Sequence, residues 1–206
     1  DVAAEFINGR PNDNMGITLF AGETFTQCPL TVDHAVLLDM IHNIKCGLIT
    51  DGTAVGMGIA NAVTRLKDSK AKSKVIILLT DGTNNKGDIS PMTAAEIAKS
   101  FGIRVYTIGV GTNGMAPYPY PVGNTVQYVS MPVEIDEKTL TEIAGTTDGN
   151  YFRATSNSKL KEVYEEIDKL EKTKLNVKEY SKRDEEYHWF ALAAFLCVLL
   201  EVLLRN

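Results

Sequence analysis

The sequence predicts a three-layer α/β domain with a doubly wound, mostly parallel sheet. Strand-like and helix-like segments alternate along most of its 206 residues. Residues 75–79 are an unbroken aliphatic run, as expected for a parallel strand that is buried on both faces. A helical periodicity from Thr53 to about Lys67 places the apolar side chains on one face: Val55, Ile59, Ala62, Val63 and Leu66. This alternation implies right-handed crossovers and helices on both faces of the sheet.

The remaining elements of the domain follow from local patterns. We expect the end of a helix at 3–8, a hairpin of strands 15–20 and 24–28 around a turn at 21–23, a helix capped by Thr31 or Asp33 that runs to about Ile44, a helix at 93–101, a strand at 103–110, a helix at 136–144, a strand at 150–153 and a helix at 156–172. Residues 111–130 are rich in Gly, Pro and Tyr. Three prolines there, Pro117, Pro119 and Pro121, exclude a helix.

The C-terminal part of the chain differs from the predicted domain, which we place at 1–174. Residues 175–186 are expected to be a charged, extended linker, and 187–206 a transmembrane helix. The 16 residues from Trp189 to Leu204 contain one charge, Glu201. As a helix they extend roughly 24 Å, against a hydrocarbon core of about 30 Å. The alternative is a buried C-terminal helix. The chain starts without Met or a signal peptide, and we expect that it lacks its natural beginning.

Composition and motifs argue against several functions. The net charge is −5, and no basic stripe occurs that would favour a nucleic-acid partner. Residues 109–114 fit G-x-G-x-x-G, but the prolines that follow prevent the helix that a dinucleotide site needs. His34, His42 and His188 do not fall at the predicted ligand-binding edge. We therefore expect a protein that is not an enzyme, with a metal-dependent hydrolase as the alternative.

The three cysteines allow two interpretations. Cys28 and Cys46 are either two buried thiols or a disulfide, which would require an oxidising compartment. Cys197 lies in the apolar C-terminal segment. The spacing does not suggest a structural zinc site.

Two segments place oxygen ligands where the carboxyl ends of parallel strands and the following loops form binding sites. Thr53 lies in Asp51-Gly52-Thr53-Ala54, before a helix, and Asp81 follows an aliphatic strand directly. A hydroxyl and a carboxylate favour hard cations: Mg²⁺, Mn²⁺ or Ca²⁺. The alternatives are a plain helix N-cap for Thr53 and a turn residue for Asp81.

Three segments in this order, 51–56, 77–82 and 105–111, together resemble the von Willebrand factor A superfamily. Residues 20–22 and 28–31, the Pro-rich segment and the tail are more narrowly similar to the bacterial aerotolerance-operon (Bat) family, nearest to its BatA members. The resemblance implies a metal-ion-dependent adhesion site (MIDAS). In such a site Thr53 matches the threonine ligand and Asp81 the aspartate that acts through water, and a partner's carboxylate fills an open position.

The sequence departs from this pattern in one respect, because no Asp-x-Ser-x-Ser occurs in it. In the family that loop follows a central first strand, whose loss would leave two unpaired edges in the sheet. We expect the full-length protein to bind Mg²⁺ or Mn²⁺, with Ca²⁺ as a further candidate, whereas the site in this chain is incomplete and need not bind any metal.

The expected partner is a protein that presents a carboxylate, with other Bat-family membrane proteins as candidates. Alternatively, Met115, Tyr118, Tyr120 and Tyr128 make 111–130 a metal-independent contact surface, or this segment is a packed Ω-like loop. The resemblance implies a bacterial inner-membrane protein with a periplasmic domain. A count of basic residues around the predicted span points instead to the cytoplasm.

Overall fold

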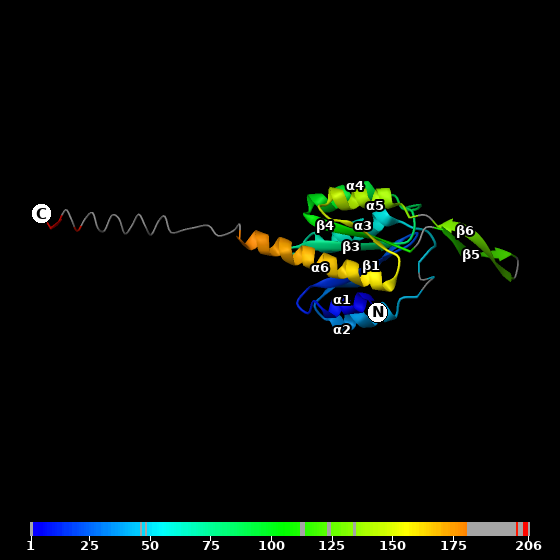
Figure 1. Ribbon diagram of the computed structural model, residues 1–206, viewed down its shortest axis with the longest axis horizontal. Coiled ribbons are helices and arrows are strands. Elements are labelled where there is room, and N and C mark those ends of the chain that lie inside the picture. Colours follow the sequence, from blue (N-terminus) through cyan, green and yellow to red (C-terminus); the bar gives the residue numbers. More distant parts are fainter. Residues whose placement is uncertain are drawn as a thin grey trace. The chain divides into compact units, whose positions relative to one another are not determined.

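The computed structural model describes residues 2–45, 47, 49–111, 114–122, 125–133, 135–180, 201 and 204–205 (Figure 1). The chain divides into a compact unit of residues 1–169 and a second unit of residues 170–206. The elements are α1 (Val2–Asn8), β1 (Met15–Phe20), β2 (Thr24–Thr31), α2 (His34–His42), α3 (Val55–Leu66), β3 (Lys74–Thr80), α4 (Pro91–Ser100), β4 (Ile103–Val110), β5 (Gly114–Val122), β6 (Thr125–Val133), α5 (Glu137–Thr146), β7 (Tyr151–Ala154) and α6 (Asn157–Tyr180).

The central sheet is parallel, as predicted, with the strand order β3-β4-β7. Strand β3 pairs with β4 from Lys74↔Ile103 to Thr80↔Gly109. Strand β4 is buried along most of its length. Burial alternates along β3, where Ile76 and Leu78 are buried but Ile77 and Leu79 are half-buried, so the prediction that 75–79 is buried on both faces was wrong for one face. The carboxyl ends of these strands therefore share one edge, where Thr80 leads into Asp81.

Strands β1 and β2 form a separate antiparallel sheet, and the predicted hairpin around 21–23 is confirmed. Within the described part of the chain, β1 pairs with β2 alone and β3 pairs with β4 alone. Helix α3 nevertheless packs against strands of both sheets. This is the arrangement predicted for a sheet that lacks its first central strand.

Capping residues define where several helices begin. Asp33, rather than Thr31, caps α2, and its carboxylate accepts a hydrogen bond of 3.2 Å from the Val36 N–H. Ser90 caps α4 in the same way, with Pro91 at the first helical position. Asp136 caps α5 and accepts from the backbone and the hydroxyl of Thr139, and these hydrogen bonds lower the pKa of Asp136.

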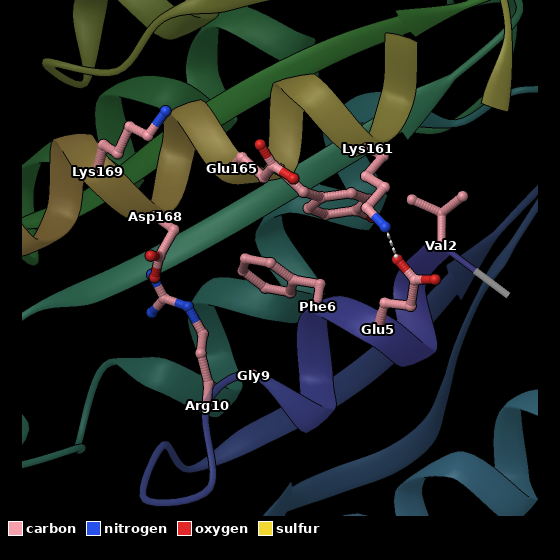
Figure 2. A pocket seen from close by; sticks show the side chains of 10 residues that line it. Val2, Glu5, Phe6, Gly9, Arg10, Lys161, Glu165, Asp168 and Lys169 are labelled. Carbon is pink, nitrogen blue, oxygen red and sulfur yellow. Dashed lines mark hydrogen bonds and ion pairs between the residues drawn. The ribbon is translucent and has the colours of Figure 1, made fainter. Parts of the chain in front are cut away.

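Helices α1 and α6 face each other across a pocket of about 320 Å³ (Figure 2). The ring centroids of Phe6 and Tyr164 lie 4.7 Å apart, and the guanidinium carbon of Arg10 lies 4.9 Å from the Phe6 ring centroid. Arg10 also forms an ion pair of 2.6 Å with Asp168, and Lys161 forms one with Glu5. A tilted contact between two aromatic rings and two ion pairs thus hold α1 against α6.

Helix α6 is longer than predicted and continues to Tyr180, so the expectation of an extended chain from 175 was wrong for its first six residues, 175–180. No Gly or Pro occurs between 157 and 180, and the Lys and Glu residues that suggested a linker are good helix formers. Most of the predicted transmembrane segment, 187–206, lies outside the described residues. No helix of the described part is long and apolar enough to cross a membrane.

The Pro-rich segment forms a β-hairpin of β5 and β6. The prediction that its prolines exclude a helix is confirmed, whereas the alternative of an Ω-like loop was wrong. Three residues expected to contact a partner, Met115, Tyr118 and Tyr120, belong to β5, but their side chains lie outside what the structure describes. Tyr128 of β6 is 73% exposed.

Candidate functional site

The segments that carry the two predicted ligands lie together at the carboxyl edge of the parallel sheet. Asp81 follows the last residue of β3 and is exposed, and half-buried Thr53 precedes α3. A Cβ atom added to Gly82 would lie 3.2 Å from the Thr53 hydroxyl oxygen. The Thr53 side chain is therefore held against the residue next to Asp81, which brings the two segments together as predicted.

Asn85 ties these segments to each other. Its side-chain oxygen accepts a hydrogen bond of 2.8 Å from the Thr53 N–H, and its own N–H donates to the Thr53 carbonyl at 3.0 Å. The Lys86 N–H reaches the same carbonyl at 3.3 Å. These hydrogen bonds fix the Thr53 backbone. The Thr53 hydroxyl itself makes no hydrogen bond among the described residues, so it is not committed to another group.

The first turn of α3 is capped by the side chain of Asn84. The alternative that Thr53 is a plain N-cap of this helix was therefore wrong. The N-cap of α3 is Ala54, which has no side chain able to cap. Instead, the Asn84 side-chain oxygen accepts a hydrogen bond of 2.9 Å from the Val55 N–H. Sequence reasoning missed both asparagines, although two adjacent Asn residues shortly after a buried strand are typical of a loop that bonds to backbone.

The turn of the β1–β2 hairpin supports the Thr53 segment from another side. The Gly22 N–H donates to the Thr50 carbonyl at 2.8 Å, and the Ala54 N–H donates to the Ala21 carbonyl at 2.7 Å. A Cβ atom at Gly22 would lie only 2.7 Å from the Asp51 carbonyl oxygen, so a larger residue does not fit there. Loops from two other parts of the chain, around residues 21–22 and 82–86, thus position Thr53.

The oxygens present fit part of a hard-cation site. A threonine hydroxyl and an aspartate carboxylate are donors that Mg²⁺ and Mn²⁺ accept, but an octahedral ion takes about six ligands. The described residues contain no group of three or more His, Cys, Asp or Glu that could hold a metal. Further ligands would have to come from water, from a partner or from additional chain.

The other chemical candidates lie outside this site. The His34 Nε2 atom is 2.8 Å from the Asp13 carbonyl oxygen, and the His42 Nδ1 atom is 2.7 Å from the Leu38 carbonyl oxygen. Cys28 is 3% exposed, and burial raises the pKa of its thiol. Cys28 is a free thiol in the structure, which agrees with the interpretation of a buried thiol and not with a disulfide, whereas Cys46 lies outside the described residues.

Comparison with known proteins gives the same assignment. The model of the von Willebrand factor type A domain matches residues 1–166. A solved BatB protein from Bacteroides thetaiotaomicron, described as a conserved hypothetical protein, is 32% identical, with a TM-score of 0.71 over 83% of this chain and 85% of that one. An aerotolerance-related membrane protein from Bacteroides fragilis is 28% identical, with a TM-score of 0.70 over 82% and 83%. The predicted resemblance to Bat proteins is confirmed at the family level. The Bacteroides thetaiotaomicron structure is a BatB, whereas the sequence was judged nearest to BatA.

Among curated proteins, an uncharacterized protein from Borreliella burgdorferi is 27% identical over 95% of this chain. The chain spans 57% of that relative, and about half the length of the other curated relatives that it matches. Domains of this kind generally mediate protein–protein interaction. Since the domain model covers most of the sequence, the chain belongs to the von Willebrand factor type A family.

Proposed function

We propose that this chain is a membrane-anchored module that binds a protein partner through a divalent cation, Mg²⁺ or Mn²⁺, at the Thr53–Asp81 edge. The observation that carries the proposal is the position of the Thr53 hydroxyl oxygen, 3.2 Å from where a Cβ atom of Gly82 would lie, beside Asp81. Because Asn84 and Asn85 satisfy the surrounding backbone, the Thr53 hydroxyl is available to a ligand.

A binding role suits this site better than a catalytic one. Neither described histidine lies with Thr53 and Asp81, and no group of described side chains provides a base beside a nucleophile there. An ion held by few protein ligands retains open positions, and a carboxylate from a partner protein fits such a position. We infer that the partner presents an acidic side chain.

The proposed anchoring concerns the C-terminal part of the chain. The domain, 1–174, would connect through a charged linker, 175–186, to a span at 187–206 in a bacterial inner membrane, with the domain on the periplasmic side. The apolar run from Trp189 to Leu204 supports the anchor. The description of the Bacteroides fragilis relative as a membrane protein is consistent with it.

Calorimetric titration with Mn²⁺ tests the metal site. The chain is compared with a longer form that carries the Asp-x-Ser-x-Ser loop of the family. We expect the longer form to bind Mn²⁺ at least about tenfold more tightly than the chain itself, since it adds direct ligands. Asp81→Ala in the longer form should abolish this gain.

Asp88→Ala is the matched control, because it removes the same charge from an exposed residue of the same loop. It should leave Mn²⁺ binding unchanged. No binding by the longer form, or an equal loss in Asp81→Ala and Asp88→Ala, would show that the proposed site does not hold the ion.

A second candidate is metal-independent partner binding through the hairpin of β5 and β6. The exposure of Tyr128 (73%) and Val129 (47%) favours it, because large exposed side chains of this kind are common in protein contacts. Partner capture that persists in excess EDTA would support the hairpin, whereas capture that needs Mg²⁺ would support the metal site.

A further inference from the structure

The hairpin of β5 and β6 places all of its prolines at equivalent positions. The Cα partners are Pro117↔Ser130, Pro119↔Tyr128, Pro121↔Val126 and Met115↔Pro132. Partners in an antiparallel pair alternate between hydrogen-bonded and non-hydrogen-bonded, and proline has no N–H to donate. Every proline thus occurs in the same class of pair.

The turn identifies that class. Val122 and Thr125 are Cα partners separated by two residues. In a hairpin with a two-residue connection, the pair that flanks the connection is a hydrogen-bonded pair. Counting back in steps of two along β5 shows that Pro117, Pro119 and Pro121 belong to the other, non-hydrogen-bonded class. Their backbone groups point away from β6, as proline in an edge strand requires.

The two outer edges of the hairpin therefore differ. The outer edge of β5 lacks an N–H donor at three successive positions and cannot pair with another strand there. On the outer edge of β6, Val126, Tyr128 and Ser130 each present an N–H and a C=O. Among the described strands, β6 pairs only with β5, and the hairpin packs extensively against no other described helix or strand.

The edge of β6 is also free of charge. Residues 114–133 contain no Asp, Glu, Lys or Arg in a chain that is 23% charged. Charged side chains are a common protection of exposed edges, and identical charged strands repel each other when they pair. An uncharged strand pairs with its own copy without that penalty.

We propose that two copies of this chain associate by antiparallel pairing of their β6 edges around a two-fold axis at Tyr128. Tyr128 then pairs with Tyr128 of the second copy, and Val126 pairs with Ser130 of the second copy. The product is a four-stranded sheet, β5-β6-β6-β5, in place of a two-stranded hairpin, which is marginal in water by itself. Since the prolines close the β5 edges, the assembly stops at a dimer. This interface is independent of the metal site.

Sedimentation equilibrium of the full chain in detergent micelles tests the proposal. We expect a dimer that Tyr128→Lys weakens by at least about tenfold, because two ammonium groups then face each other across the axis. Pro119→Lys is the matched control, since it places the same charge on the Cα partner of Tyr128 but at the β5 edge. It should leave the dimer unchanged.

Two further variants locate the contact. Tyr128→Cys should form an intermolecular disulfide above the level of the unsubstituted chain, because paired Cα atoms about 5.5 Å apart are within bridging distance. Replacement of Pro117, Pro119 and Pro121 by Ala should open the second edge and give assemblies larger than a dimer. A monomer at all concentrations, or a dimer that both lysine variants affect equally, overturns the proposal. A monomer would leave the β6 edge to a strand of another protein.

Discussion

Substitution of Gly56 by Ala tests how the helix behind Thr53 is positioned. Gly56 is buried in the first turn of α3, where a Cβ atom would collide with the Ile89 carbonyl oxygen and lie 2.7 Å from the carbonyl carbon of Ser90. Both atoms belong to the backbone, so no side-chain rotation can relieve the contact. Helix α3 would have to move away from this loop, and Thr53 would move with it.

The magnitude follows from two opposing effects. Overpacking of a close contact costs about 1–3 kcal/mol, whereas Ala in place of Gly in a helix contributes up to about 1 kcal/mol. Because the collision is with backbone atoms, the overpacking cost lies in the upper part of its range, about 2–3 kcal/mol, and the net loss of unfolding free energy is about 1–2 kcal/mol. For a domain of this size that corresponds to a decrease in Tm of about 2–8 °C.

Gly145→Ala in α5 is the matched control. No atom lies within 4 Å of a Cβ added there, and Gly145 is exposed. Only the gain in helix propensity remains, so Tm should increase by about 1–3 °C. Thermal unfolding followed by circular dichroism distinguishes the two variants. An unchanged or higher Tm for Gly56→Ala would refute the backbone contact between α3 and the 89–90 segment.

Two predictions concern buried groups. Thr147→Val should lower the unfolding free energy by about 1–3 kcal/mol in urea titrations, because it leaves the Val105 N–H buried without the acceptor that now lies 3.0 Å away. The control Thr141→Val, at an exposed position of α5, should change the unfolding free energy by less than about 0.5 kcal/mol. Similar losses in the two variants would contradict the assigned hydrogen bond. Burial raises the pKa of Tyr164 to about 12, against about 10 for tyrosine in the unfolded chain. The corresponding stability is present below pH 10 and should be lost between about pH 10 and 12, by up to about 2.7 kcal/mol. Urea midpoints at about pH 9 and 11.5 should show that Tyr164→Phe removes this part of the loss and that Tyr128→Phe does not; equal behaviour of the two variants would disprove the assignment.

Much of the domain could be predicted because its sequence patterns are local. The aliphatic run of β3 identified a strand, although only alternate residues of it are fully buried, and the helical spacing of Val55, Ile59 and Val63 identified the buried face of α3. The hairpin of β5 and β6 could not be recognised by composition, because its prolines suggest a loop. Their spacing of two residues was the missed signal, since it fits one edge of a strand.

The site could be predicted only in part. Thr53 and Asp81 were identifiable because Thr53 precedes a helix and Asp81 follows a strand at the expected edge of the sheet. Asn84 and Asn85 were not, because their roles depend on hydrogen bonds to residues about thirty positions away in the sequence. The gap between the β1–β2 sheet and the β3-β4-β7 sheet followed from the family pattern and not from any local feature.

Paramagnetic broadening by Mn²⁺ tests the central claim most directly, since it locates a bound ion even when binding is weak. Backbone amide signals of the isotopically labelled chain are followed as a small fraction of an equivalent of Mn²⁺ is added. We predict that the signals of Ala54 and Gly82, beside the two ligands, broaden first. Broadening at acidic positions of α6, such as Glu165 and Glu166, while Ala54 and Gly82 remain sharp, would contradict a cation site at the Thr53–Asp81 edge.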